Sequence, residues 1–162
     1  AGMQSAQYDL VSHIIGAVTT LCEGEVLQGQ HAREVDTTRQ DYLEIIYKKT
    51  ASLISISASA GAVSANALRK DVEHMRRFGE ALGMAFQIQD DILDLTGDEA
   101  KLGKPVGSDE KNEKTTYVTL HGLEAAAAEV KRLSEEAVEL AKEMNASEFL
   151  QELITYLTVR EN

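Results

Sequence analysis

Apolar residues recur at steps of three and four along most of this chain of 162 residues. This spacing places them on one face of an α-helix, because a helix turns once in about 3.6 residues. It predicts a first helix over residues 4–30, with an apolar stripe formed by Leu10, Ile14, Ile15, Val18, Leu21, Cys22 and Val26. The periodicity therefore restricts the chain to folds in which helices pack against helices.

A second helix is expected to follow a polar loop at residues 33–40. Its predicted stripe consists of Leu43, Ile46, Thr50, Leu53, Ser57 and Ala60. The segment from Ser52 to Gly61 is rich in alanine and serine. Such small side chains either let a neighbouring helix approach closely or line a cavity.

The second half of the chain contains two long predicted helices, at residues 68–95 and 124–144, and a polar segment between them. This segment, residues 96–114, holds the only proline, three glycines and no sustained apolar period. Asn145 and Glu148 resemble a capping box that opens a last helix over residues 146–158. With 43% hydrophobic residues, a chain of this length builds one core. We therefore predict one all-α domain with a long polar loop.

The charge and the cysteine content exclude several classes of protein. Sixteen Lys and Arg residues against 27 Asp and Glu give a net charge of −11, which disfavours generic nucleic-acid binding. No apolar run reaches the roughly 18 residues that a membrane span needs, and the start of the sequence lacks the features of a secretory signal. The single cysteine, Cys22, cannot form an internal disulfide and is predicted to be buried. These features favour a protein of the reducing cytoplasm.

The residues most informative about chemistry lie near the end of the third predicted helix. Asp90, Asp91 and Asp94 share a sector of about 100° on this helix with Gln87. Three carboxylates this close repel one another and favour a bound cation. Oxygen ligands without His or Cys suit a hard divalent ion, and Mg²⁺ commonly bridges carboxylates to substrate phosphates. Gly83, on the same face, leaves room for another group to approach the helix.

Two interpretations of this carboxylate cluster stay open at this point. In an acidic protein it could be a solvated helix face. Against this, the flanking residues are apolar, and the adjacent polar segment carries Lys101, Lys104, Lys111 and Lys114. Metal ions and cationic side chains together hold a diphosphate group best, so the pattern also fits a metal–diphosphate site.

A resemblance to a known family adds to these patterns. Residues 83–115, GMAFQIQDDILDLTGDEAKLGKPVGSDEKNEKT, closely resemble the second aspartate-rich motif and the following loop of the trans-isoprenyl diphosphate synthases, or polyprenyl synthetases. Segments 24–28 and 47–50 are also similar to this family, and the resemblance extends from about residue 21 to residue 119. It implies an all-α helical bundle of the isoprenoid synthase type. It also implies an Mg²⁺-dependent prenyltransferase that condenses isopentenyl diphosphate with an allylic prenyl diphosphate.

The resemblance implies a role for each residue that matches a family motif. The implied catalytic residues are Lys49, Thr50, Gln87 and Asp90. The implied Mg²⁺ ligands are Asp90, Asp91 and Asp94. The implied diphosphate-binding residues are Lys49, Thr50, Gln87 and the loop lysines Lys104 and Lys114, which would close over the substrate. Glu25 and Gln28 stand where many farnesyl synthases have Gln and Asp, a difference that resembles longer-chain members.

The chain departs from this family in one respect. Asp90–Asp91 is its only Asp–Asp pair, so the first aspartate-rich motif of the family is missing. The sequence thus resembles the C-terminal half of such an enzyme, without the N-terminal helices, and we expect the chain alone to be inactive. The implied partners are the N-terminal half of the same enzyme and a second copy in a homodimer. The alternative is a non-catalytic helical subunit that completes or regulates a partner synthase. A class I terpene cyclase is disfavoured, because the NSE-type metal motif is absent.

Overall fold

A computed structural model describes residues 2–31, 37–97, 107, 114–144 and 148–158 of the chain, with side chains from residue 11 onward. The helices are α1 (Gly2–His31), α2 (Arg39–Ile46), the π-helix η1 (Tyr47–Ala51), α3 (Ser52–Ser64), α4 (Arg69–Thr96), α7 (Tyr117–His121), α8 (Leu123–Glu143) and α9 (Glu148–Thr158). No β-strand occurs in these described residues. The all-α prediction is therefore confirmed.

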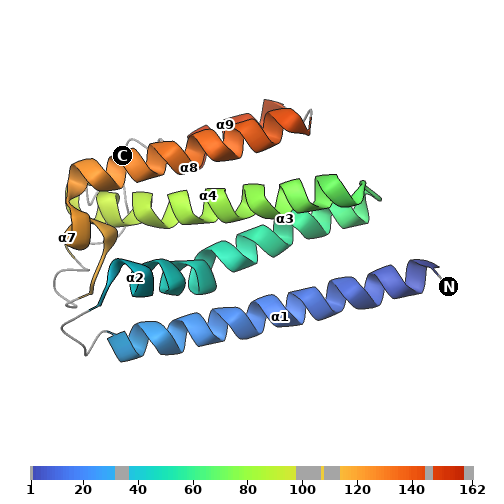
Figure 1. Cartoon of the computed structure of the whole chain (residues 1–162), viewed down its shortest axis with the longest axis horizontal. Helices are drawn as coiled ribbons and strands as arrows, with labels where there is room; N and C mark the ends of the chain where they lie inside the picture. The colour runs from blue at the N-terminus through green and yellow to red at the C-terminus, as the bar shows by residue number, and fades with distance from the viewer. Residues whose placement is uncertain (1, 32–36, 98–106, 108–113, 145–147, 159–162) are drawn as a thin grey trace.

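The long helices lie side by side and run in alternating directions (Figure 1). The helix α4 occupies the centre, packed against α3 on one side and α8 on the other, while α1 lies along η1 and α3. The carboxyl ends of α1 and α4, the start of α2 and the short helix α7 all gather at one end of the bundle (Figure 1). Within the described part of the chain, no helix combines the length and hydropathy required to cross a membrane.

The core is centred on α4 because its apolar residues recur every three or four positions. Leu82 and Ile88 are 2% and 0% exposed, so each contributes roughly 1.5–3 kcal/mol of burial free energy. They belong to one cluster with apolar residues of α8 and α9. The members of this cluster from those two helices include Val130, Leu133, Ala137, Leu140 and Ile154.

Most predicted helices are found within two residues of their expected ends. The predicted 68–95 and 124–144 correspond to α4 and α8, and 4–30 corresponds to α1. The polar loop ends earlier than predicted, because Thr38 caps α2 through a reciprocal pair of hydrogen bonds with Asp41. Asn145 and the proposed capping box lie outside the described residues. The last helix is observed from Glu148 to Thr158.

The second predicted helix contains a π-turn that the periodicity did not indicate. Its buried face runs through Tyr42, Ile46, Ala51, Ser55 and Ser59, so one step, from Ile46 to Ala51, is five residues long. A π-turn holds one residue more than an α-turn, since its hydrogen bonds join positions five apart. Beyond the turn, the predicted stripe is therefore wrong at Leu53 and Ser57, whereas Ala60 is half-buried. Leu53 is 39% exposed and Ser57 is also exposed.

Small residues bring α4 unusually close to the preceding helix. A Cβ atom on Gly79 would lie 2.5 Å from the Cα of Ser55, and one on Gly83 would lie 2.6 Å from the Cα of Ala51. Of the two possibilities for the small-residue segment 52–61, close helix approach is the one observed. The group that approaches Gly83 is thus the backbone of η1.

The outer face of α1 exposes apolar residues. Side chains along it are 44% to 61% exposed, and they include Val11, Ile14, Ile15, Val18 and Val26. The prediction that Cys22 is buried is wrong, because Cys22 is exposed on this helix. The residues of α1 that face the bundle include Ala17, Leu21, Gly24 and Leu27. No described part of the chain covers the apolar stripe of α1.

Candidate functional site

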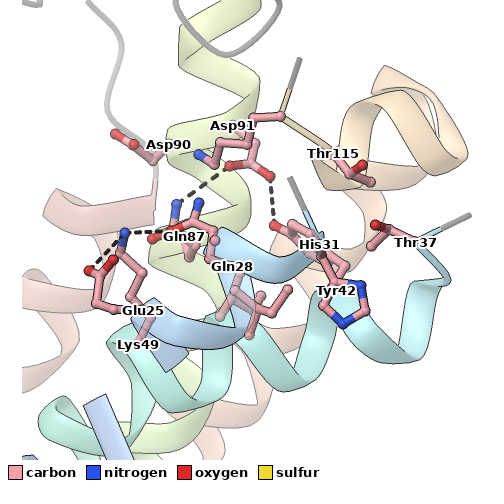
Figure 2. A pocket seen from close by; sticks show the side chains of 14 residues that line it. Glu25, Gln28, His31, Thr37, Tyr42, Lys49, Gln87, Asp90, Asp91 and Thr115 are labelled. Atoms are coloured by element: carbon pink, nitrogen blue, oxygen red, sulfur yellow. Dashed lines mark hydrogen bonds and ion pairs between the residues drawn. The ribbon is translucent and has the colours of Figure 1, made fainter. Parts of the chain in front are cut away.

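A cavity of about 530 Å³ opens at the end of the bundle where α1, α2, η1 and α4 meet (Figure 2). Five of the implied site residues line it: Lys49, Gln87, Asp90, Asp91 and Lys114. Lys114 lies at the start of the segment that leads into α7. The other lining residues are Glu25, Gln28, Gly29, His31, Thr37, Tyr42, Ile45, Ile46 and Thr115.

Asp91 is fixed in the wall of this cavity by three hydrogen bonds. The hydroxyl of Tyr42 donates to its Oδ2 at 2.6 Å, and the backbone N–H of Tyr117 donates to the same oxygen at 3.0 Å. The Nε2 of Gln87 donates to Oδ1 at 3.4 Å. Burial raises the pKa of Asp91, whereas these hydrogen bonds and the charge of Lys114 act in the opposite direction. One buried carboxylate thereby joins α2, α4 and α7.

Gln87 links Asp91 to Thr50. The hydroxyl of Thr50 donates to Gln87 Oε1 at 3.1 Å, while the amide nitrogen of Gln87 points to Asp91. These two bonds fix the orientation of the amide, because its oxygen and nitrogen each meet a specific partner. Thr50, on η1, is thus connected to the carboxylate end of α4 by a continuous chain of hydrogen bonds, of which Figure 2 shows the bond between Gln87 and Asp91.

The ammonium group of Lys49 reaches the cavity from the π-turn. It donates to Gln28 Oε1 at 2.7 Å and forms an ion pair with Glu25 Oε1 at 3.0 Å, both on α1 (Figure 2). The backbone of the π-turn lies directly against α1 at Gly24. A Cβ atom there would be 2.6 Å from the backbone nitrogen of Lys49.

The three aspartates do not share one environment. Asp90 and Asp91 line the cavity, whereas Asp94, which is as buried as Asp91, is not among the lining residues. The described residues contain no group of three or more acidic or His and Cys side chains arranged to hold a metal. Mg²⁺ is commonly bound by one or two carboxylates together with substrate phosphates rather than by an all-protein cage. The donor set therefore fits Mg²⁺ held in part by Asp90 and completed by phosphate oxygens.

The remaining predicted site residues fall into two groups. Thr50 contacts the site through Gln87, and Lys114 lines the cavity, so both lie beside the predicted cluster. Lys104 and most of the polar segment 96–114 lie outside the described residues. The predicted closure of that segment over a diphosphate stays a prediction.

Sequence reasoning missed the aromatic and hydroxyl groups of the site. Tyr42 and Tyr117 hold Asp91, and their rings lie 5.9 Å apart in an edge-to-face arrangement. His31 and Thr37 also line the cavity, and neither was among the predicted site residues. Only the position of Tyr42 on the inward face of the second predicted helix could have suggested its role, since the partner Asp91 is 49 residues away.

Comparisons with known proteins agree with this geometry. The family model described as polyprenyl synthetase matches residues 2–157. The short chain isoprenyl diphosphate synthase of Methanothermobacter thermautotrophicus is 34% identical over 148 residues, which cover 84% of this chain and 46% of the relative. The chain thus spans about half the length of this curated relative.

Solved structures show the same fold. The heptaprenyl diphosphate synthase of Staphylococcus aureus superposes with a TM-score of 0.88 at 26% identity, covering 95% of this chain and 60% of that protein. A polyprenyl synthase from Caulobacter crescentus CB15, solved with calcium and isoprenyl diphosphate, superposes with a TM-score of 0.88 at 25% identity. It covers 99% of this chain and 62% of that protein. The chain therefore belongs to the polyprenyl synthetase family.

Proposed function

We propose that this chain carries the second aspartate-rich half of a prenyltransferase site, which joins isopentenyl diphosphate to an allylic prenyl diphosphate. The observation that carries the proposal is the convergence of Lys49, Gln87 and Asp90 on one cavity, with Thr50 bonded to Gln87. These groups come from η1 and α4, which are far apart in the sequence. A solvated acidic face has no need of a lysine and an amide at the same cavity.

The charges at this cavity suit a metal–diphosphate substrate. Asp90 supplies a carboxylate, while Lys49 and Lys114 supply cations at the same cavity. When bound, Mg²⁺ would neutralise the charge that builds up on the departing diphosphate. The solved relative from Caulobacter crescentus, with calcium and isoprenyl diphosphate in its crystal, supports a divalent ion and a prenyl diphosphate as ligands.

The proposed reaction places simple demands on the protein. The bond between the allylic carbon and the diphosphate oxygen breaks, and the electron pair leaves with the diphosphate. The double bond of isopentenyl diphosphate then attacks the resulting carbocation, and the diphosphate accepts the proton that is lost. Lys49 binds the diphosphate oxygens as their charge grows, and the Thr50–Gln87–Asp91 chain keeps the polar wall in place. Excluding water protects the carbocation.

The chain would need a second half to complete this site. It spans 46% of the relative from Methanothermobacter thermautotrophicus, and none of the described residues packs over the apolar stripe on α1. We propose that the N-terminal half of the enzyme, with the first aspartate-rich motif, packs there. The 162-residue chain alone would then lack synthase activity. A homodimeric assembly, which the family resemblance implies, and a cytoplasmic location, which the single cysteine favours, belong to the same proposal.

The alternative of a non-catalytic subunit is favoured by one observation, the short share of each relative that the chain covers. A subunit that only completes a partner would not depend on the carboxylates of its own cavity. The two roles therefore differ in the expected effect of replacing Asp90: a catalytic role predicts a loss of prenyl transfer, and a purely structural role predicts none.

The test is to replace Asp90 in the complete enzyme. We expect Asp90→Asn to lower the rate of prenyl transfer by about 10²–10³-fold, the usual effect of losing one electrostatic group from an active site. Asp71→Asn, which removes the same charge near the other end of α4, is the control and should keep the wild-type rate. Unchanged circular dichroism would show that both variants fold. A wild-type rate for Asp90→Asn would leave only the subunit role.

A further inference from the structure

The lysine that faces the cavity already has an anionic partner. Lys49 Nζ lies 3.0 Å from Glu25 Oε1 and 2.7 Å from Gln28 Oε1, so two of its three N–H groups point to α1. The side chains of Lys49 and Glu25 are 35% and 52% exposed. The pair is thus open to solvent and free to separate when another anion arrives.

Glu25 lies at the same cavity as the lysine rather than behind it. Both residues line the cavity, as does Gln28 (Figure 2). A diphosphate group that contacts Lys49 therefore comes close to the carboxylate of Glu25, and like charges at short range repel one another. The amide of Gln28 carries no charge and exerts no such repulsion.

The backbone around this pair is held firmly. The helix α1 lies against the π-turn at Gly24, where there is no space for a Cβ atom beside Lys49 N. Glu25 follows Gly24 directly, so the close approach of the two backbones fixes the carboxylate opposite the lysine. The ion pair is a consequence of helix packing and does not depend on a mobile loop.

We propose that Glu25 is an internal counter-ion that competes with the diphosphate group for Lys49. Binding of diphosphate separates the pair, and the return of Lys49 to Glu25 favours release of the diphosphate after the reaction. Glu25 thus tunes how tightly the cavity holds its anion, while Gln28 keeps the ammonium group near the opening. This inference rests on the proposed function, because it assumes that the cavity takes a diphosphate.

The experiment measures the binding of inorganic diphosphate, in the presence of Mg²⁺, to the complete protein by isothermal titration calorimetry. Glu25→Gln keeps the shape of the side chain and removes its charge. Since an exposed ion pair contributes up to about 1 kcal/mol, we expect this variant to bind diphosphate about three- to fivefold more tightly. The matched control is Glu23→Gln, which removes the same charge from α1. Glu23 pairs with Lys48 at 3.4 Å and does not line the cavity. This control should leave the affinity unchanged.

Measuring the same substitution in a protein that also carries Lys49→Gln distinguishes competition for Lys49 from simple repulsion between Glu25 and the diphosphate. In a Lys49→Gln protein there is no ammonium group to release, so Glu25→Gln should tighten binding by a smaller factor than in the wild type. An equal factor in both backgrounds would overturn the counter-ion role. Weaker or unchanged binding by Glu25→Gln would also overturn it and would make Glu25 a positioning residue. If the wild-type protein binds no diphosphate at all, the proposed function fails first, and the two failures are thereby distinguished.

Discussion

The close approach of η1 to α4 predicts that two glycine substitutions of the same kind will have opposite effects on stability. Gly83 is buried, and a Cβ atom added there would lie 2.6 Å from the Cα of Ala51 and 3.0 Å from its Cβ. Gly61, in α3, is exposed and has no atom within 4 Å of an added Cβ. Both glycines are helical, so replacing either with alanine changes helix propensity in the same way.

The expected magnitudes follow from these two environments. Alanine gains about 1 kcal/mol over glycine inside a helix. At Gly61 nothing opposes this gain, so Gly61→Ala should stabilise the protein by about 0.5–1 kcal/mol. At Gly83 the obstruction is backbone and Cβ rather than a flexible side chain, so the cost of overpacking should be near the upper end of its usual range, about 3 kcal/mol. Gly83→Ala should therefore destabilise the protein by a net ~2 kcal/mol.

Chemical and thermal denaturation, both followed by circular dichroism, would check the two values. The expected loss of stability for Gly83→Ala corresponds to a fall in Tm of about 4–8 °C in a chain of this size. Because Ala51 directly follows Thr50, the same variant should also reduce diphosphate binding, whereas Gly61→Ala should not. If Gly83→Ala proved as stable as Gly61→Ala, η1 and α4 would not be in tight contact at Gly83.

Two further substitutions test the carboxylate wall and the core. Tyr42→Phe removes the 2.6 Å hydrogen bond to Asp91 and should destabilise the protein by about 1–3 kcal/mol, as measured by denaturation. The control Tyr156→Phe changes a residue that is 72% exposed and should leave the stability unchanged. Equal losses of stability in both variants would contradict the role of the hydrogen bond. Ile88→Ala removes a side chain that is 0% exposed and should cost about 2–5 kcal/mol. The same truncation at Leu95, which is 55% exposed, should cost far less, and a similar loss at both positions would argue against the assigned core.

Much of the fold was predictable because local periodicity dominates in long helices. The limits of α4 and α8 differ from the predicted ones by a single residue, since their apolar repeats are uninterrupted. The π-turn was not predictable in this way. Its backbone lies against Gly24 of α1 at Lys49, and a contact between residues so far apart leaves no trace in the local pattern.

The candidate site was predictable in its chemistry but not in its contacts. Of the residues predicted to share one helix face, Gln87, Asp90 and Asp91 line one cavity, whereas Asp94 is buried and does not line it. It did not distinguish a carboxylate held by three hydrogen bonds from its neighbours, because the donors to Asp91 come from Tyr42 and from the backbone of a distant segment. The ion pair between Lys49 and Glu25 likewise joins two helices whose relative position periodicity cannot give.

The three hydrogen bonds on Asp91 have a consequence for the motions of the molecule. Two of their donors, Tyr42 and the N–H of Tyr117, belong to the short helices α2 and α7. Short helices of this kind normally open and close independently of the core. Here both are tied to one oxygen atom on α4, so opening either helix would break a hydrogen bond to a buried carboxyl group. The amide of Tyr117 should thus exchange its hydrogen at a rate set by α4, and it is a natural reporter of whether this end of the bundle is intact.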